Sequence, residues 1–148
     1  MLPIENQILD ISETESLALK FSKNLKAGDV LMLKGELGVG KTTLSRFIIN
    51  SLYSLNNLLK PILINSPTYP ILLTYELSSY EIYHYDFYRI KNVKELEELD
   101  FFENIKNSIT LIEWPELLID LPFNQKYYLI NINIHSETKR VINIKYFE

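Results

Sequence analysis

The 148-residue chain contains no cysteine, only four glycines and a single tryptophan. The absence of cysteine excludes disulfide bonds and thiolate metal ligands. No apolar run approaches the roughly 18 residues that a membrane-spanning helix requires. Residues 1–6 lack the basic start and long apolar stretch of a secretory signal. We therefore expect a cytoplasmic protein without a membrane segment.

Positive charge is also scarce. Fifteen Lys and Arg residues stand against nineteen Asp and Glu residues, which gives a net charge of −4. The only arginines are Arg46, Arg89 and Arg140. A protein that grips RNA by itself normally has a clustered basic face, and the sequence shows none. We therefore expect any contact with nucleic acid to be indirect.

Length and composition are those of one globular domain that spans residues 1–148. Hydrophobic residues make up 47% of the chain and charged residues 23%, and both values are ordinary for such a domain. The chain is long enough to bury a proper core. No internal repeat, low-complexity tract or linker divides it.

Three of the four glycines fall within residues 35–42, which read G-E-L-G-V-G-K-T. This is the spacing of the phosphate-binding P-loop, G-x-x-x-x-G-K-[ST]. Glycine allows a positive φ and a close approach of the backbone to a ligand, so that successive N–H groups form a nest for an anion. The predicted phosphate-binding residues are Gly35, Gly38, Val39, Gly40, Lys41 and Thr42.

The flanks of this loop agree with that interpretation. The apolar run 30–33 is typical of a buried parallel strand, and residues 43–52 carry apolar side chains near helical spacing. The helix would add its positive N-terminal end to the anion site. Lys41 is then expected to reach the β- and γ-phosphates of ATP, and Thr42 to complete the ligand shell of Mg²⁺. A glycine-rich turn with a chance lysine is the disfavoured alternative.

The other elements predict an α/β fold of the P-loop NTPase type. Its sheet should be mixed parallel and antiparallel, with flanking helices. A capping box at Ser12 and Glu15 predicts a helix that ends near residues 27–28. The remaining predicted elements are an edge strand at 4–11, strands at 61–64 and 109–112, a helix at 94–102, and hairpins 71–77/81–85 and 127–134/140–147.

Two acids follow apolar strands. Phosphoryl transfer needs a carboxylate near Mg²⁺ and a group that positions the nucleophile, in addition to the P-loop. Glu113 ends the strand 109–112, and we predict that it contacts Mg²⁺ directly or through water. Asp86 ends the strand 81–85, and we predict that it positions or polarises the attacking water. The competing interpretation is that both acids cap strand ends and turns.

Other polar and aromatic residues have more modest interpretations. Thr68 lies where a loop that senses the γ-phosphate would be, although a plain proline turn is the simpler interpretation. His84 is expected to be a hydrogen-bonded structural residue and not a base. Trp114 packs against the sheet end or faces the nucleotide. The acids in residues 95–103 are expected to form a solvated helix face, with a docking surface for a basic partner as the alternative.

Four stretches together resemble the bacterial TsaE family, the small P-loop ATPases of tRNA threonylcarbamoyladenosine biosynthesis. They read G-E-L-G-V-G-K-T-T at 35–43, S-P-T-Y at 66–69, H-Y-D-F-Y-R at 84–89 and E-W-P-E at 113–116. The P-loop alone is generic, whereas the last three stretches in this order are specific. The resemblance extends from about residue 12 to residue 116.

The resemblance implies a single domain that binds ATP with Mg²⁺, hydrolyses it slowly alone and docks on the TsaB–TsaD assembly. ATP would reset that assembly between rounds of modification of the adenosine beside the anticodon, so contact with tRNA would be indirect. The implied catalytic, phosphate and metal residues are Lys41, Thr42, Asp86 and Glu113, with Thr43 and Trp114 near the nucleotide.

The resemblance also has weaker parts. Glu13 and Arg140 are implied as contacts to adenine or ribose. Asp100 stands where the family often has glycine, so we expect the turn after the acidic helix to differ.

Two other functions stay open. A small-molecule kinase usually supplies several arginines to clamp the transferring phosphate, and a lid to exclude water. Three scattered arginines disfavour that interpretation. A nucleotide-binding scaffold with little turnover is the third possibility, although binding alone does not require two strand-end acids.

Overall fold

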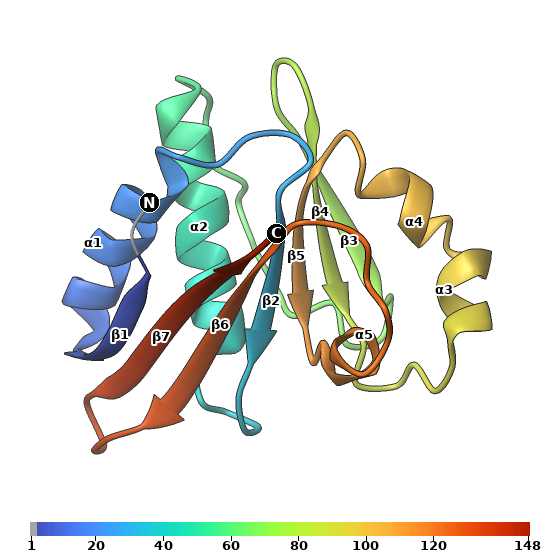
Figure 1. Ribbon diagram of the computed structural model, residues 1–148. Helices are drawn as coiled ribbons and strands as arrows, with labels where there is room; N and C mark the ends of the chain where they lie inside the picture. Colours follow the sequence, from blue (N-terminus) through green and yellow to red (C-terminus); the bar gives the residue numbers. More distant parts are fainter. Residues whose placement is uncertain (1–2) are drawn as a thin grey trace.

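The structure is a computed structural model that describes residues 3–148 (Figure 1). Within this range one seven-stranded sheet is flanked by five helices. The strands are β1 (Ile4–Leu9), β2 (Val30–Lys34), β3 (Leu72–Glu76), β4 (Glu81–Asp86), β5 (Ile109–Glu113), β6 (Tyr127–Ile134) and β7 (Arg140–Phe147). The helices are α1 (Ile11–Ser22), α2 (Lys41–Leu55), α3 (Val93–Glu98), α4 (Phe101–Asn104) and α5 (Glu116–Ile119).

The sheet is mixed, as predicted, and its strand order is β1-β7-β6-β2-β5-β4-β3. The four central strands β6, β2, β5 and β4 are parallel. The outer strands pair antiparallel. On one side β7 pairs with β6 and β1 pairs with β7, and on the other side β3 pairs with β4. The carboxyl ends of β2, β5 and β4 therefore lie next to one another at the same end of the sheet, where ligands of open α/β sheets bind.

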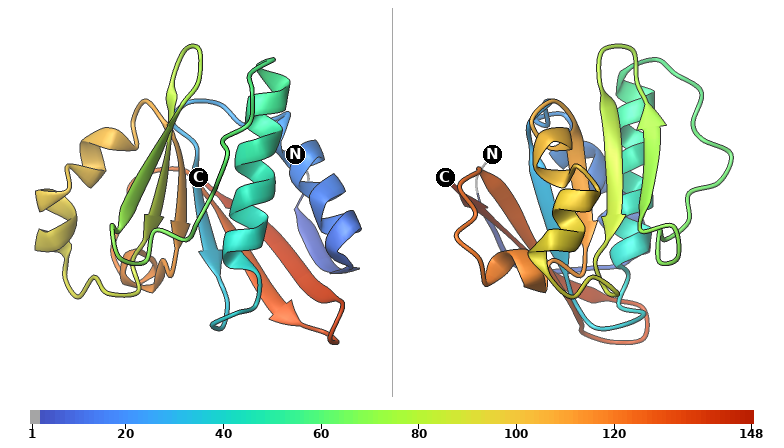
Figure 2. Two further views of the ribbon diagram at one scale, coloured as in Figure 1. Left: turned by 180° about the vertical axis from the view of Figure 1, so that it is seen from behind. Right: turned by 90° about the vertical axis from the view of Figure 1, so that its right-hand side faces the viewer.

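The core lies on both faces of the sheet, so the central strands are apolar at successive positions. In β2, Leu31 and Leu33 belong to the cluster that α1 and α2 cover, whereas Val30 and Met32 belong to the cluster beneath α3, α4 and α5. All four side chains are fully buried. Figure 2 shows α2 in front of the sheet when the molecule is seen from behind, and Figure 1 shows α5 on the opposite face.

Helix α1 begins earlier than predicted. Its N-cap is Asp10 and not Ser12, and Glu13 closes the capping box in place of Glu15. The Glu13 N–H donates to Asp10 Oδ1 and the Asp10 N–H donates to Glu13 Oε2, both at 2.8 Å. The spacing D-x-x-E two residues upstream offers the same reciprocal cap, and it is used because β1 already ends at Leu9. The helix ends at Ser22, before the predicted residues 27–28.

The predicted strand at 61–64 is wrong. These residues connect α2 to β3 without pairing in the sheet, and Ile62 is fully exposed. Both positions beside β2 are occupied, by β5 and β6. The run therefore has no place beside β2, and within it only Ile64 is buried.

The predicted helix at 94–102 is interrupted. Asp100 adopts left-handed backbone geometry, with φ 54° and ψ 27°, and separates α3 from α4. Helix α3 begins at Val93 behind a capping box of Asn92 and Glu95, and it is shorter than predicted because the chain turns after Leu99.

The two predicted hairpins and the edge strand are confirmed. Strand β3 pairs antiparallel with β4, β6 pairs antiparallel with β7, and β1 pairs antiparallel with β7. Between residues 3 and 148, no helix is both long enough and apolar enough to span a bilayer.

Candidate nucleotide-binding site

The loop of residues 35–40 joins β2 to α2 and imposes two demands on its glycines. Gly40 caps α2 with φ 120°, a conformation that residues with a side chain rarely adopt. A Cβ atom on Gly35 would lie 2.7 Å from both the carbonyl oxygen of Ile132 and Cγ1 of Val39. The loop is therefore pressed against β6. The Val39 N–H donates to the Glu36 carbonyl oxygen within the loop, whereas the first N–H groups of a helix such as α2 have no acceptor within the helix.

Lys41 lies across this loop and is only 5% exposed. Its Nζ donates to the carbonyl oxygens of Gly35 and Glu36 at 2.7 and 2.9 Å. The same atom lies 4.0 Å from the centre of the Trp114 ring. Burial lowers the pKa of the Lys41 ammonium, while nearby carboxylates, Glu113 first among them, act in the opposite direction.

The parallel register of β4 and β5 places Asp86 opposite Glu113. Both side chains are almost completely buried, at 2% exposure. Glu113 belongs to the same site as α2, because Thr42 Oγ1 donates to Glu113 Oε2 at 3.0 Å. The two acids predicted from strand ends thus stand side by side beneath the glycine-rich loop.

The donor set fits Mg²⁺ in partnership with a phosphate. Thr42 and Glu113 supply hard hydroxyl and carboxylate oxygens, which Mg²⁺ prefers. Among residues 3–148, no group of three His, Cys, Asp or Glu residues forms a self-sufficient metal cage. Mg²⁺ in nucleotide sites is usually held by one or two carboxylates, substrate phosphates and water, which agrees with this sparse set.

The S-P-T-Y loop is attached to Asp86. Ser66 Oγ donates to Asp86 Oδ2 at 3.1 Å, and Thr68 Oγ1 donates to the same oxygen at 3.2 Å. The other oxygen, Oδ1, accepts from the Tyr88 N–H at 2.9 Å. The interpretation of Thr68 as part of a plain proline turn is therefore incomplete. Asp86 does stabilise a turn, but it also holds the hydroxyl-rich loop at the site.

His84 and Trp114 occupy different depths of the site. His84 is fully buried, and its Nε2 lies 2.9 Å from Glu113 Oε1, so it is a hydrogen-bonded interior residue as predicted. Trp114 has φ 58°. Its ring lies over Lys41 and 4.9 Å from the ring of Tyr88. Trp114 therefore faces the glycine-rich loop and does not simply pack against the sheet end.

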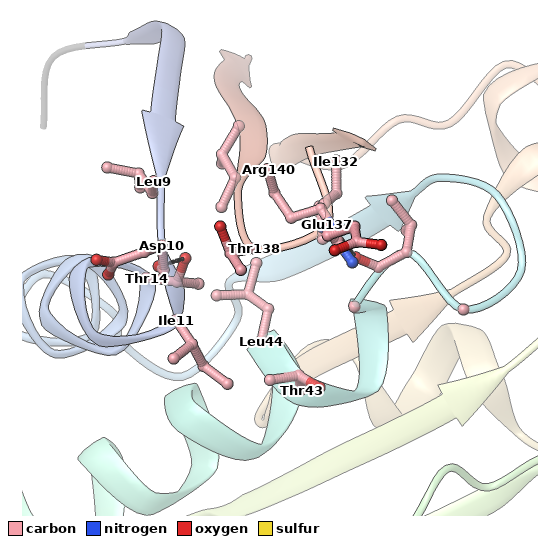
Figure 3. A pocket seen from close by; sticks show the side chains of 14 residues that line it. Leu9, Asp10, Ile11, Thr14, Thr43, Leu44, Ile132, Glu137, Thr138 and Arg140 are labelled. Carbon is pink, nitrogen blue, oxygen red and sulfur yellow. Dashed lines mark hydrogen bonds between the residues drawn. The ribbon is translucent and has the colours of Figure 1, made fainter. Parts of the chain in front are cut away.

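Two cavities flank the loop and share Gly38, Gly40 and Thr43 in their walls. The first, of about 370 Å³, contains the polar cluster of the acids, and Trp114 closes one side. The second, of about 350 Å³, lies between the start of α1, the loop and the turn from β6 to β7 (Figure 3). Together they form a bipartite site on the two sides of the loop, with the buried acids in the first cavity.

At the second cavity, Arg140 links the turn between β6 and β7 to the glycine-rich loop. Its Nε donates to the carbonyl oxygen of Val39 at 2.8 Å, and its Nη1 donates to the carbonyl oxygens of Ser136 and Lys139. Glu13, which the resemblance implied as a nucleotide contact, does not line this cavity, because its carboxylate closes the α1 capping box.

Sequence reasoning missed several residues of the site. Asp10 and Thr14 line the second cavity, and the D-x-x-E signal at residues 10–13 would have placed the helix start beside the loop. Ser66 was visible only as part of a hydroxyl-rich stretch. Its contact with Asp86 depends on where the connection from α2 to β3 passes the end of β4, which no local pattern states.

This fold and this loop define an α/β protein of the P-loop NTPase-like class. The crystal structure of Bacillus subtilis YdiB matches it with a TM-score of 0.62, over 97% of this chain and 87% of that one, at 21% sequence identity. The predicted fold class is thereby confirmed. The chain belongs to the TsaE family, because the family model described as threonylcarbamoyl adenosine biosynthesis protein TsaE matches residues 8–142.

Individual relatives agree with this family. The tRNA threonylcarbamoyladenosine biosynthesis protein TsaE of Rickettsia typhi is 38% identical over 133 residues, which cover 90% of this chain and 88% of the relative. The protein of the same name from Aquifex aeolicus is 31% identical over 142 residues, which cover 95% and 96% of the two chains. The resemblance inferred from the four sequence stretches is confirmed.

Proposed function

We propose that this chain is a Mg²⁺-dependent ATPase that supports threonylcarbamoyladenosine modification of tRNA in the cytoplasm. It would act as an accessory component that uses ATP to reset a TsaB–TsaD assembly between catalytic rounds. Membership of the TsaE family supports the pathway. The ATPase activity, the cofactors and the partners are the parts that the proposal adds.

One observation carries the proposal. Lys41, Thr42, Asp86 and Glu113 come from three separate segments of the chain, yet they line a single cavity beside the N-terminus of α2. Two buried acids without an ion pair to Lys or Arg are costly, and among residues 3–148 no Lys or Arg salt bridge compensates either of them. A cation brought by the nucleotide would offset that cost.

Each residue then has a role that follows from its position. The main-chain N–H groups of residues 38–42 and the Lys41 ammonium bind the phosphates. Thr42 and Glu113 would hold Mg²⁺, which when bound neutralises phosphate charge. Asp86 accepts a proton or orients water through the oxygen that now binds Ser66 and Thr68. Trp114 excludes water from the Lys41 side.

The second cavity suits the adenosine part of ATP. It adjoins the phosphate loop through Gly38, Gly40 and Thr43, and both apolar and polar side chains line it. Such pockets bury a flat base and orient it with a few polar groups. Arg140 is occupied by main-chain carbonyl oxygens, so we expect it to shape this cavity more than to clamp phosphate.

The arginines also favour hydrolysis over transfer to a small molecule. Arg46 donates to the carbonyl oxygen of Ile64, and Arg140 supports the loop from the adenosine side. Arg89 reaches the Thr68 carbonyl oxygen and the Tyr69 ring at the rim. A kinase that clamps a transferring phosphate normally points several arginines into the site.

The test has a cellular arm and a test-tube arm. Depletion of the protein in its host should lower threonylcarbamoyladenosine in bulk tRNA, measured by mass spectrometry, and unaltered levels would overturn the pathway assignment. The purified chain should release phosphate from Mg-ATP slowly and faster when TsaB–TsaD is added. A phosphorylated small molecule in place of free phosphate would favour the kinase, and no turnover in either mixture would favour the scaffold.

A further inference from the structure

We propose that His84 is a positioning residue that fixes the carboxylate of Glu113 from below. Its Nε2–H holds one carboxylate oxygen, so that the other is presented to Thr42 and to the proposed Mg²⁺ position. This inference rests on the proposed function, since it assigns a task to a residue behind the proposed metal contact. His84 does not touch the nucleotide and is not a catalytic residue.

The sheet register puts His84 in place. Strands β4 and β5 are parallel, with His84 opposite Leu111 and Asp86 opposite Glu113. Because side chains alternate along a strand, His84 and Asp86 point to the same face of the sheet. His84 therefore lies one step deeper than Asp86, and its imidazole reaches diagonally to Glu113 on the neighbouring strand, with Nε2 2.9 Å from Oε1.

The two oxygens of Glu113 have separate partners. Oε1 contacts His84, whereas Oε2 contacts Thr42 Oγ1 at 3.0 Å and Ser66 Oγ at 3.5 Å. A carboxylate turns easily about its last torsion, which is broad and roughly two-fold. A hydrogen bond to one oxygen removes that freedom and leaves the other as a single, directed ligand. Mg²⁺ demands near-octahedral geometry, so this restriction matters to metal binding.

The unpaired ring nitrogen supports this direction of the hydrogen bond. His84 Nδ1 is buried and has no hydrogen-bond partner among residues 3–148. An ionised carboxylate can only accept, so the proposed hydrogen bond places the proton on Nε2 and leaves Nδ1 as an unpaired acceptor. A buried polar atom without a partner costs stability. The imidazole thus pairs with the Glu113 oxygen while its own Nδ1 stays unpaired, which agrees with a role centred on that single contact.

Glutamine and asparagine provide a matched pair of variants at position 84, because their amide nitrogens lie at different distances from the backbone. The amide nitrogen of glutamine lies near the position of imidazole Nε2, whereas that of asparagine lies near Nδ1. His84→Gln should therefore keep the donor to Glu113, and His84→Asn should lose it. Both variants leave an amide at the same buried site, so a general effect of polarity would affect them alike.

The quantity to measure is the effect of the metal ion on nucleotide affinity, which does not require ATP hydrolysis. ADP affinity is measured by calorimetry with saturating Mn²⁺ and again with EDTA, and the ratio of the two affinities is the coupling. Removal of a hydrogen-bonding partner behind a metal ligand typically costs about 10- to 100-fold in metal affinity. We expect His84→Asn to lower the ratio by about that factor and His84→Gln to keep it, with the EDTA affinity unchanged in both.

The outcomes separate the two proposals. A wild-type chain that binds no nucleotide, or binds it without metal coupling, overturns the proposed function and this inference with it. A wild-type chain with coupling, and a His84→Asn ratio equal to it, overturns only the role of His84. Loss of coupling in His84→Gln likewise overturns the role of the Nε2 donor. If circular dichroism shows that His84→Asn is unfolded, His84→Leu removes the same donor within the apolar layer, and its ratio decides.

Discussion

The ammonium of Lys41 has exchanged water for two carbonyl oxygens and the face of an indole ring. This arrangement keeps the cation satisfied in a position where burial disfavours its charged form. The contacts are made with the loop that would carry the phosphates. An incoming triphosphate would therefore compete with carbonyl oxygens for a cation that is already in place, and little side-chain ordering would remain to be done on binding.

The first prediction concerns this cation. We expect Lys41→Ala to weaken Mg-ATP binding by at least about 100-fold, because hydrogen bonds to charged groups contribute roughly 1.5–3 kcal/mol each and the lysine can make more than one. Calorimetry with the purified chain measures the change. Lys145→Ala is the control, since Lys145 is an exposed residue of β7 away from both loop cavities. Equal affinities in wild type and Lys41→Ala would reject the phosphate assignment.

The second prediction separates binding from turnover at Asp86. Asp86→Ala should bind Mg-ATP within a few-fold of wild type, yet its phosphate release should fall by about 100-fold or more, which is the usual contribution of a positioned acid or base. Because Asp86 also tethers Thr68, Thr68→Val is the matched control: it removes one tether and keeps the carboxylate. If Asp86→Ala turns over normally, Asp86 is structural. An equal loss in Thr68→Val would assign the effect to the loop.

At the level of strands and helices, the hairpins and the buried strands were predictable because alternation and apolar runs are local signals. The glycine-rich loop was predictable for the same reason. The order of the strands is not local, however, and Asp86 meets Glu113 only because β4 lies beside β5. The contact from His84 to Glu113 follows from that neighbourhood, and the tether from Ser66 to Asp86 follows from the path of the connection between α2 and β3. Local sequence patterns could therefore indicate both acids, but not the residues that hydrogen-bond to them.

Helix boundaries failed for a different reason. Two overlapping capping signals stand at residues 10–15, and the end of β1 selects the earlier one. Asp100 gives no local signal of a break, yet its left-handed geometry divides the acidic helix in two. That this turn differs from the turn of a family that often has glycine there stays a prediction; Asp100 itself adopts a left-handed geometry, which glycine adopts without strain.

The third prediction tests that break. Asp100→Gly should raise the free energy of unfolding by about 0.5–1 kcal/mol, because it removes part of the cost of a left-handed residue with a side chain. Its side chain makes no capping hydrogen bond that would be lost. Asp100→Ala should lower the same quantity, since alanine tolerates this geometry less well than aspartate. Urea unfolding measures both. Asp100→Gly no more stable than Asp100→Ala would show that the backbone is not strained.

The molecule as a whole combines a net negative charge with a proposed anion-binding site. Net charge is −4, and the exposed side of α3 adds Glu97 and Glu98 to the surface. The positive elements of the site are Lys41 and the start of α2, which lie inside cavities and not on an open face. The net negative charge thus disfavours the approach of a polyanion, while the cavity would admit a small triphosphate.

The last prediction follows from this charge distribution. The isolated chain should bind tRNA with a dissociation constant weaker than about 10 µM at physiological salt, in the range of non-specific contacts, and the affinity should fall further as salt rises. Fluorescence anisotropy of labelled tRNA at two salt concentrations measures both. The double variant Glu97→Lys/Glu98→Lys is the control: each change replaces one negative charge with one positive charge, so the net charge rises by two per change, from −4 to 0. It should tighten binding at low salt and leave ATP affinity unchanged, because α3 does not line either loop cavity. Submicromolar binding by the wild-type chain at physiological salt would mean that a specific tRNA surface exists, and the indirect role proposed for it would then be wrong.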